Sequence, residues 1–199
     1  MHRFTRGDAP VDMTRARKKY TDWTAFSRSE EHGQLGTALH ERQSKYCAYC
    51  AKYLSEKREG HIEHLERRSD NPKRTFDWRN LFFSCNHLYS CGKYKDTLKI
   101  KFKPEDIVDP SQEDPADFFY FDSNGFIWAR SGAGEARAKE TIRVFNLNAP
   151  QLVSARRHVA RAVEKLYAYS DKELDEFLAS MSECDYLVVW YMLLGRKMP

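Results

Sequence analysis

The sequence predicts an α+β fold in which a cysteine-rich core lies between helical segments. Four of the five cysteines fall within a window of 45 residues, and short apolar stretches beside them suit strands. Apolar residues at helical spacing occur toward both ends. At 199 residues the chain can bury a core of ordinary size. We expect a basic N-terminal tail and helix over residues 1–34, the core over 35–103, and a hairpin plus helices over 104–199.

The N-terminal segment is basic and poor in apolar residues. Six Lys or Arg side chains lie within residues 1–20, which is typical of an arm that becomes ordered only on a partner. Residues 21–45 are expected to be helical, in at least two pieces broken near Gly33 and Gly36.

The core contains signals for strands, turns and one helix. His61–Leu65 is a short strand candidate, and the sequence 69–72 (Ser-Asp-Asn-Pro) indicates a turn. A helix is expected to follow Cys91 and to end at about 95–99.

The C-terminal half predicts a hairpin and two helices. Two aromatic segments flank Asp122-Ser-Asn-Gly125, which suits a hairpin turn. Asn148 is the expected N-cap of a helix with Pro150 in its first turn. A second helix is expected from Ser170, with Glu173 completing a capping box, and to run on to residue 194. Cys184, in that apolar stretch, is expected to be a small buried hydrophobe.

Composition excludes some classes of protein. Hydrophobic residues make up 41% and mean hydropathy is −0.75, with no apolar run near the ~20 residues of a membrane helix. The polar N-terminus does not resemble a secretory signal, so we expect a cytoplasmic protein. Residues 1–103 carry 22 Lys and Arg against 13 Asp and Glu, a balance of +9, whereas the remainder carries 11 against 16, a balance of −5. The basic half therefore favours nucleic acid as a partner.

The cysteine spacing is the strongest motif. Cys47 and Cys50 are separated by two residues, and Cys85 and Cys91 follow about 35 residues later. Two such pairs can close a tetrahedral zinc site of four thiolates that supplies folding free energy. Because the second spacing is five residues rather than two, His87 is an alternative ligand.

Between the cysteine pairs lies a possible catalytic group. Glu63 precedes His64, and Asn80 follows sixteen residues later. A glutamate can bind a divalent cation through oxygen, a histidine can take a proton from water near neutral pH, and an asparagine can fix a loop by hydrogen bonds.

These motifs resemble the HNH endonucleases. The resemblance rests on Cys-x2-Cys, Ile62-Glu-His64, Trp-x-Asn-Leu-x3-Cys and Cys-Gly-x2-Lys-Asp, and covers about residues 35–100. More narrowly, the segments 39–50 and 76–81 look like the PtuB-type HNH subunit of Septu anti-phage systems, including those attached to retrons. The segment 141–148 is also similar to that group.

The resemblance implies a ββα-metal fold, in which a hairpin and a helix surround one divalent cation such as Mg²⁺ and zinc braces the whole. It implies that His64 is the general base and that Asn80 orients it. It also implies partners: nucleic acid, with DNA the expected form, an ABC/SMC-like ATPase of the PtuA type, and in retron systems a reverse transcriptase with its RNA–DNA product.

One position departs from the family pattern. Many HNH nucleases place a metal-binding histidine directly after the last zinc cysteine, whereas this chain has Gly92. Beside Glu63, the candidates for the missing ligand are Asp96, His87 and His61. Asp96 fits best because it lies at the start of the expected final helix.

Basic residues around these motifs are candidates for phosphate contacts, which give affinity without sequence specificity. They are Arg67, Arg68, Lys73, Arg74, Arg79, Lys93, Lys95 and Lys99.

We therefore expect a metal-dependent endonuclease that acts as the effector of an anti-phage complex. The alternative is a catalytically silent zinc module that binds nucleic acid or serves as an adaptor for the ATPase, with the acidic C-terminal half as an assembly surface.

Overall fold

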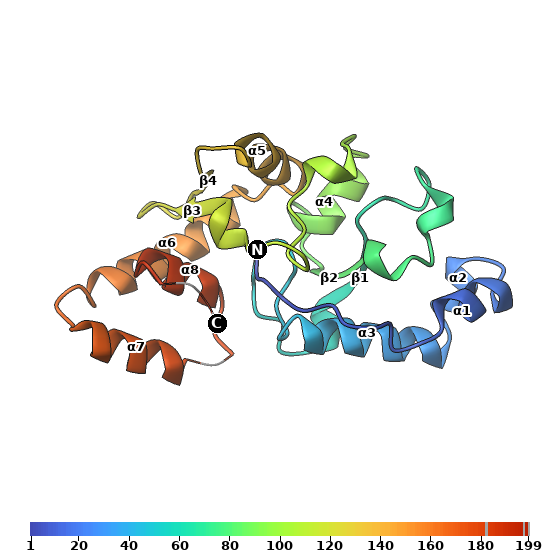
Figure 1. The fold of residues 1–199 in the computed structure, drawn as a ribbon, viewed down its shortest axis with the longest axis horizontal. Helices are drawn as coiled ribbons and strands as arrows, with labels where there is room; N and C mark the ends of the chain where they lie inside the picture. The colour runs from blue at the N-terminus through green and yellow to red at the C-terminus, as the bar shows by residue number, and fades with distance from the viewer. Residues whose placement is uncertain (182, 197, 199) are drawn as a thin grey trace.

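Two small antiparallel sheets surrounded by helices make up the fold (Figure 1). The computed structural model describes residues 1–181, 183–196 and 198. The expected α+β class is confirmed. The helices are α1 Met13–Lys19, α2 Trp23–Phe26, α3 Glu30–Arg42, α4 Cys91–Thr97, α5 Glu135–Val144, α6 Pro150–Glu164, α7 Asp171–Ser180 and α8 Leu187–Leu193, and the strands are β1 Gly60–His64, β2 Leu81–Cys85, β3 Phe119–Phe121 and β4 Ile127–Ala129.

The centre of the fold is a β-hairpin followed by a helix. Strands β1 and β2 pair antiparallel, with Gly60 opposite Cys85 and His64 opposite Leu81. Helix α4 begins at Cys91 and contacts β2. The strand expected near His61–Leu65 and the helix expected after Cys91 are both present. This ββα unit places the last strand residue, His64, near the helix.

Helix α3 differs from the prediction in its boundaries. Gly33 and Gly36 lie inside it, and the break falls earlier, where Ser29 caps the helix by accepting a hydrogen bond from the His32 amide. The helix is fixed to β2 by Gln43, whose side chain bonds both the amide and the carbonyl of Phe83. A local cap and a buried side chain thus outweigh the low helix propensity of glycine.

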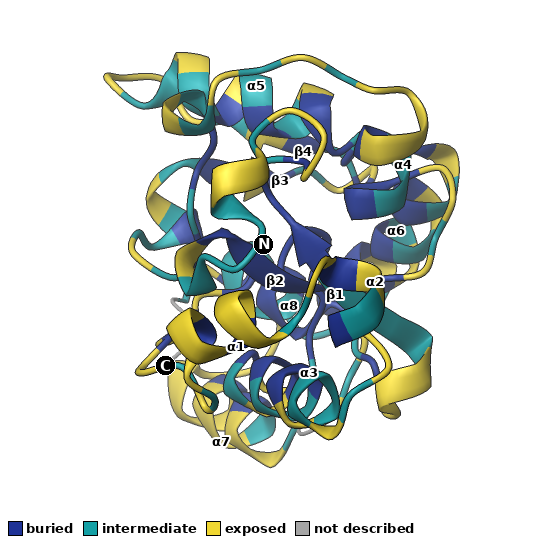
Figure 2. Cartoon of the chain, turned by 90° about the vertical axis from the view of Figure 1, so that its right-hand side faces the viewer, coloured by how far each residue is buried: buried dark blue, intermediate teal, exposed yellow. Residues whose placement is uncertain are grey.

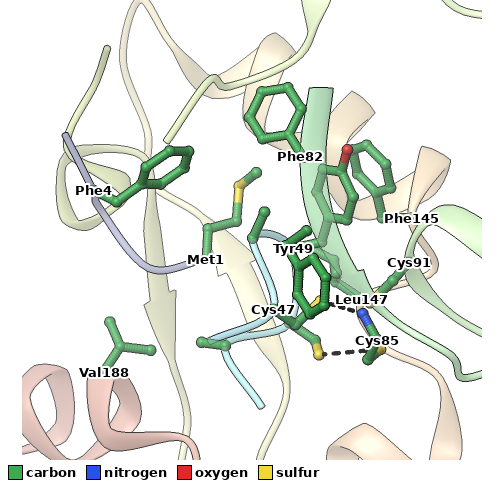
Figure 3. Packing of buried hydrophobic residues seen from close by; sticks show 14 of the residues in the cluster. Met1, Phe4, Cys47, Tyr49, Phe82, Cys85, Cys91, Phe145, Leu147 and Val188 are labelled. Atoms are coloured by element: carbon green, nitrogen blue, oxygen red, sulfur yellow. Dashed lines mark hydrogen bonds between the residues drawn. The ribbon is translucent and has the colours of Figure 1, made fainter. Parts of the chain in front are cut away.

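The N-terminal segment is not the free arm that its charge suggests. Met1 and Phe4 belong to the hydrophobic core, and Figure 3 shows them in one cluster with Tyr49 and Phe82. Arg6 is buried and donates to the carbonyls of Trp78 and Leu81. The expectation of an arm ordered by a partner is therefore wrong, because its few apolar side chains find a site on this chain.

The second sheet is the predicted hairpin. Strands β3 and β4 pair antiparallel around a turn that ends at Gly125, where φ is +84°. Glycine suits this turn, and a Cβ here would lie 2.3 Å from the Val153 carbonyl oxygen. Asn148 does not cap α6, since Ala149 occupies that position. Its side chain instead bonds the amide and carbonyl of Ile127, and so joins the hairpin to α6.

The last two helices are separate. The capping box of Ser170 and Glu173 is confirmed at the start of α7, but that helix ends at Ser180 and α8 begins at Leu187. Cys184 lies in the connection and is only half-buried. The expectation of a continuous helix with a buried cysteine is therefore corrected.

One hydrophobic core runs through both halves of the chain. Buried positions lie on the central strands and on the inner faces of α3, α5, α6 and α8 (Figure 2). Tyr49 stacks on Phe145, with ring centroids 3.8 Å apart, and the Cys91 amide donates to the Phe145 carbonyl at 2.8 Å. The C-terminal half thus packs directly on the cysteine-rich core. Among the described residues, none of the helices has the length and apolar character needed to cross a membrane.

Candidate functional site

Four cysteine side chains converge at the base of the ββα unit. The Sγ atoms of Cys47, Cys50, Cys85 and Cys91 are all buried and lie within 4.8 Å of one another. Figure 3 shows Cys47, Cys85 and Cys91, as labelled, near Tyr49. Tetrahedral zinc with Zn–S bonds of about 2.3 Å requires sulfur separations of about 3.8 Å. The Cys50 and Cys85 sulfurs are 3.9 Å apart. The cluster therefore has the donors and the dimensions of a structural zinc site.

The backbone and the neighbouring thiols favour a thiolate at Cys47. The Cys85 amide donates to its Sγ at 3.4 Å. Burial alone would raise the pKa of this thiol, but hydrogen bonds from the other three cysteines lower that pKa well below its usual range. A thiolate is the form that binds zinc. His87, the alternative ligand, lies outside the cluster, where its Nδ1 accepts from the Tyr89 amide.

A cleft of about 680 Å³ opens beside the ends of β1 and α4. It is lined by side chains from α2, from β1 and its following loop, and from α4. Both acidic and basic groups face it. The lining residues are Trp23, His61, Ile62, Glu63, His64, Arg67, Arg68, Ser69, Lys93, Asp96 and Thr97.

His64 lines this cleft with a defined tautomer. Its Nε2 lies 3.0 Å from the carbonyl oxygen of Thr75, and a carbonyl can only accept, so Nε2 carries the proton and Nδ1 the lone pair. The indole of Trp23 packs edge-on against the ring, with centroids 4.4 Å apart. Burial lowers the pKa of His64 to about 4, and the nearby cations Arg68 and Lys95 also lower it, against the Thr75 bond. The imidazole is therefore neutral at physiological pH.

Asn80 holds the loop between β1 and β2 rather than contacting His64. It is fully buried; its Oδ1 accepts from the Glu66 amide at 2.8 Å, and its Nδ2 donates to the carbonyls of Glu66 and Arg74. Thr75, which accepts from His64, directly follows Arg74 in this loop. Asn80 thus holds the backbone of the loop that carries Thr75.

Glu63 points away from solvent into a buried polar cluster. One carboxylate oxygen accepts from the Tyr49 hydroxyl, and the other lies 2.7 Å from Lys95 Nζ. Burial raises the pKa of Glu63, and Lys95 partly offsets this. The same ammonium lies 2.7 Å from Asp96, whose side chain is 45% exposed at the cleft. Both expected oxygen ligands of a catalytic cation therefore share one lysine.

Gly92 is required by the position of Glu63. A Cβ at residue 92 would lie 2.3 Å from Glu63 Cγ and 3.3 Å from Ser84 Oγ. Such a contact is far inside van der Waals distance, so no larger residue fits without moving the glutamate.

The other histidine candidates lie apart from this pair. His61 lines the cleft, but its Nδ1 lies 3.1 Å from Asn86 Oδ1. His87 does not line the cleft. Within the part of the chain that the structure describes, the four cysteines are the one group of three or more potential metal ligands whose donor atoms converge.

The candidate phosphate-binding residues divide by exposure. Arg68, Lys73, Arg79 and Lys99 are exposed, and Lys93 is half-buried at the cleft. Arg74 is engaged with Glu66 and Asp77.

The expectation that Arg67 and Lys95 contact phosphate is wrong, because both side chains are buried. Arg67 is 8% exposed and donates to Asp70 and to the carbonyls of Lys95 and Ile100. Lys95 is fully buried. Both side chains hold the loop and α4 together, because buried cations are stable only where carboxylates and carbonyls surround them.

Three groups at the site were not predicted from the sequence. They are the Trp23 ring against His64, the Thr75 carbonyl that fixes its tautomer, and the Tyr49 hydroxyl on Glu63. In the sequence, Trp23 and Tyr49 are indistinguishable from ordinary core aromatics. The Thr75 carbonyl cannot be predicted from residue type, because every residue has a backbone carbonyl. Only the three-dimensional contacts identify them.

No protein-family model matches this chain, and no curated protein matches it significantly in sequence. The resemblance to HNH endonucleases rests on the motif residues alone.

Proposed function

We propose that this chain is an HNH-type endonuclease that hydrolyses nucleic-acid phosphodiesters in the cleft beside His64. The observation that carries the proposal is the neutral imidazole of His64, held by the Thr75 carbonyl at the end of β1 in a ββα unit. The four-cysteine cluster at the base of the same unit supports it. The cations at the cleft, exposed Arg68 and half-buried Lys93, suit a polyanionic substrate.

In this mechanism His64 is the general base. With Nε2–H donated to the Thr75 carbonyl, the lone pair on Nδ1 takes a proton from water as the water oxygen attacks phosphorus. The bond from phosphorus to the leaving ester oxygen breaks, and that oxygen takes a proton from solvent. Arg68 and Lys93 stabilise the charge that develops on the phosphoryl oxygens. Asn80 keeps the loop that carries Thr75 in place.

The family resemblance also implies a catalytic divalent cation such as Mg²⁺, which would stabilise developing charge. Its expected ligands, Glu63 and Asp96, are both in contact with the Lys95 ammonium, and Gly92 offers no ligand atom. The donors therefore suit an ammonium in this arrangement, and no step of the mechanism passes through a metal ion.

The ATPase partner of the PtuA type, and in retron systems a reverse transcriptase with its RNA–DNA product, belong to the proposal through the motif resemblance. The apolar side chains of the N-terminal segment, Met1 and Phe4, are packed in the core, whereas the basic side chains of α1 stay exposed. The exposed tyrosines after α6, Tyr167 and Tyr169, are available for contact with a partner.

Cleavage by the reconstituted complex tests the proposal. We expect His64→Ala to reduce the rate by about 10²–10⁴-fold, the usual contribution of a general base. The matched control is His158→Ala, which removes an exposed histidine on α6. Both variants should keep the wild-type zinc content. Cleavage by His64→Ala at the control rate would disprove the assignment.

A second candidate function is a silent zinc module that binds nucleic acid. The observation that favours it is the ion pair between Glu63 and Lys95, which occupies a carboxylate expected to bind a catalytic cation. Salt-dependent binding of DNA or RNA by the wild-type complex, without cleavage of either, would favour this reading over the nuclease.

A further inference from the structure

The ammonium of Lys95 lies inside a cage of four oxygen atoms. It is 2.7 Å from Asp96 Oδ1, 2.7 Å from Glu63 Oε1, 2.8 Å from the His64 carbonyl and 3.1 Å from the Leu65 carbonyl. The lysine side chain is fully buried. The cage joins the end of β1 to α4 at the inner edge of the cleft.

The arrangement of hydrogen bonds suits a protonated lysine. An ammonium has three donors, and the two carbonyls and Asp96 accept them. The fourth oxygen, Glu63 Oε1, is buried without an aligned donor among the described residues, and is held by charge alone. Burial would lower the pKa of Lys95, but the two carboxylates raise it above its ordinary value.

The same oxygens would be ligands for a hard divalent cation. Two carboxylates and two carbonyls are the donor types that Mg²⁺, Mn²⁺ and Ca²⁺ prefer, at about 2.0–2.6 Å. The observed separations of 2.7–3.1 Å are those of hydrogen bonds to nitrogen. A second cation cannot share this cage with the ammonium, because the two would repel each other across a buried space.

We infer that Lys95 is the resident cation of the cleft and that its ammonium takes the position of a divalent metal ion there. The chain then binds no divalent cation through Glu63 and Asp96. Removing the ammonium while leaving room converts the oxygen cage into a metal site. This inference concerns cation binding and is tested without a cleavage assay. Its failure can therefore be distinguished from a failure of the proposed function.

Mn²⁺ binding to the zinc-loaded chain tests the inference. The electron paramagnetic resonance signal of free Mn²⁺ disappears when the ion binds, so its loss measures the binding. Mn²⁺ prefers oxygen ligands and does not compete with zinc for thiolates. At 0.1 mM protein and Mn²⁺, we expect the wild type to leave the free signal unchanged. Lys95→Ala should bind one Mn²⁺ per chain, at least tenfold more tightly than the wild type.

Two matched variants identify the site. Lys95→Met fills the vacated space without a charge and should bind no Mn²⁺. Lys95→Ala combined with Asp96→Asn removes one carboxylate and should lose at least tenfold of the gained affinity. Zinc content and circular dichroism show whether each variant has folded.

Two results would overturn the inference. One is Mn²⁺ binding by the wild type that Glu63→Gln or Asp96→Asn abolishes, since the ammonium would then yield its place to a metal. The other is a folded Lys95→Ala that binds no more Mn²⁺ than Lys95→Met. If Lys95→Ala fails to fold, the wild-type measurement with Asp96→Asn as its control still decides the first point.

Discussion

His2 and His64 are buried imidazoles whose burial lowers the pKa of each to about 4. Between pH 6.5 and 4 the unfolded chain therefore binds protons that the folded chain does not, so stability falls as pH is lowered through this window. We expect each histidine to remove roughly 1–2 kcal/mol between pH 6.5 and 5.

Unfolding in denaturant at several pH values checks this expectation for His2. His2→Phe keeps a ring against Tyr46 and should flatten the pH dependence by that amount relative to wild type. An unchanged slope would show that His2 is not held neutral by the fold.

Substituting alanine at Gly92 and at Gly33 tests how much space each position leaves for a side chain. Gly92→Ala places a Cβ 2.3 Å from Glu63 Cγ, whereas nothing lies within 4 Å of a Cβ at Gly33. We expect Gly92→Ala to destabilise by about 1–3 kcal/mol and Gly33→Ala, inside α3, to stabilise by about 0.5–1 kcal/mol. The free energy of unfolding is the measurement, and equal effects of the two variants would contradict the packing described here.

At the scale of elements, the β1–β2 loop depends on Asn80. Asn80→Ala removes three hydrogen bonds and leaves the Glu66 amide and carbonyl without their side-chain partner. We expect a loss of about 2–4 kcal/mol and faster hydrogen exchange at the Glu66 amide. Asn80→Asp, which keeps the acceptor only, should protect that amide better than Asn80→Ala. Wild-type exchange in both variants would contradict the positioning role.

The sequence predicted elements whose signals are local and missed contacts that are not. The strand at His61–Leu65 and the hairpin turn at Gly125 follow from short patterns, and both are present. Asn148 carries the signal of a helix cap, but its side chain bonds strand β4 instead. Nothing in residue type distinguishes these two uses of an asparagine.

The candidate site was predictable in part for the same reason. Cysteine spacing implies convergence because a metal leaves few alternatives, and the four sulfurs do converge. Lys95 and Arg67 looked like surface cations because their burial depends on carboxylates and carbonyls brought together by the fold. The roles of His64 and Asn80 remain predictions, with the geometry described above in their support.

At the scale of the whole molecule, the cysteine centre and the C-terminal half form one unit. The Cys91 amide donates to the Phe145 carbonyl, and the Tyr49 ring stacks on the Phe145 ring. Loss of the metal should therefore destabilise the chain beyond the ββα unit. We expect Cys50→Ser to lose bound zinc and to lower Tm by about 10 °C or more, which corresponds to about 3 kcal/mol or more.

Cys184→Ser is the control for the cysteine centre, because this residue lies in the α7–α8 connection away from the cluster. It should keep one zinc per chain and the wild-type Tm. Zinc analysis and thermal unfolding measure both variants. Equal zinc content in Cys50→Ser and wild type would show that the four thiols are not the ligands.

The central claim is that the His64 imidazole is the base that activates water in the cleft. Imidazole rescue of single-turnover cleavage by the reconstituted complex carrying His64→Gly tests it most directly. The account predicts a rate at least 10²-fold below wild type, which rises with added imidazole, while His158→Gly cleaves at the wild-type rate and does not respond. Cleavage by His64→Gly at the wild-type rate without imidazole would contradict it.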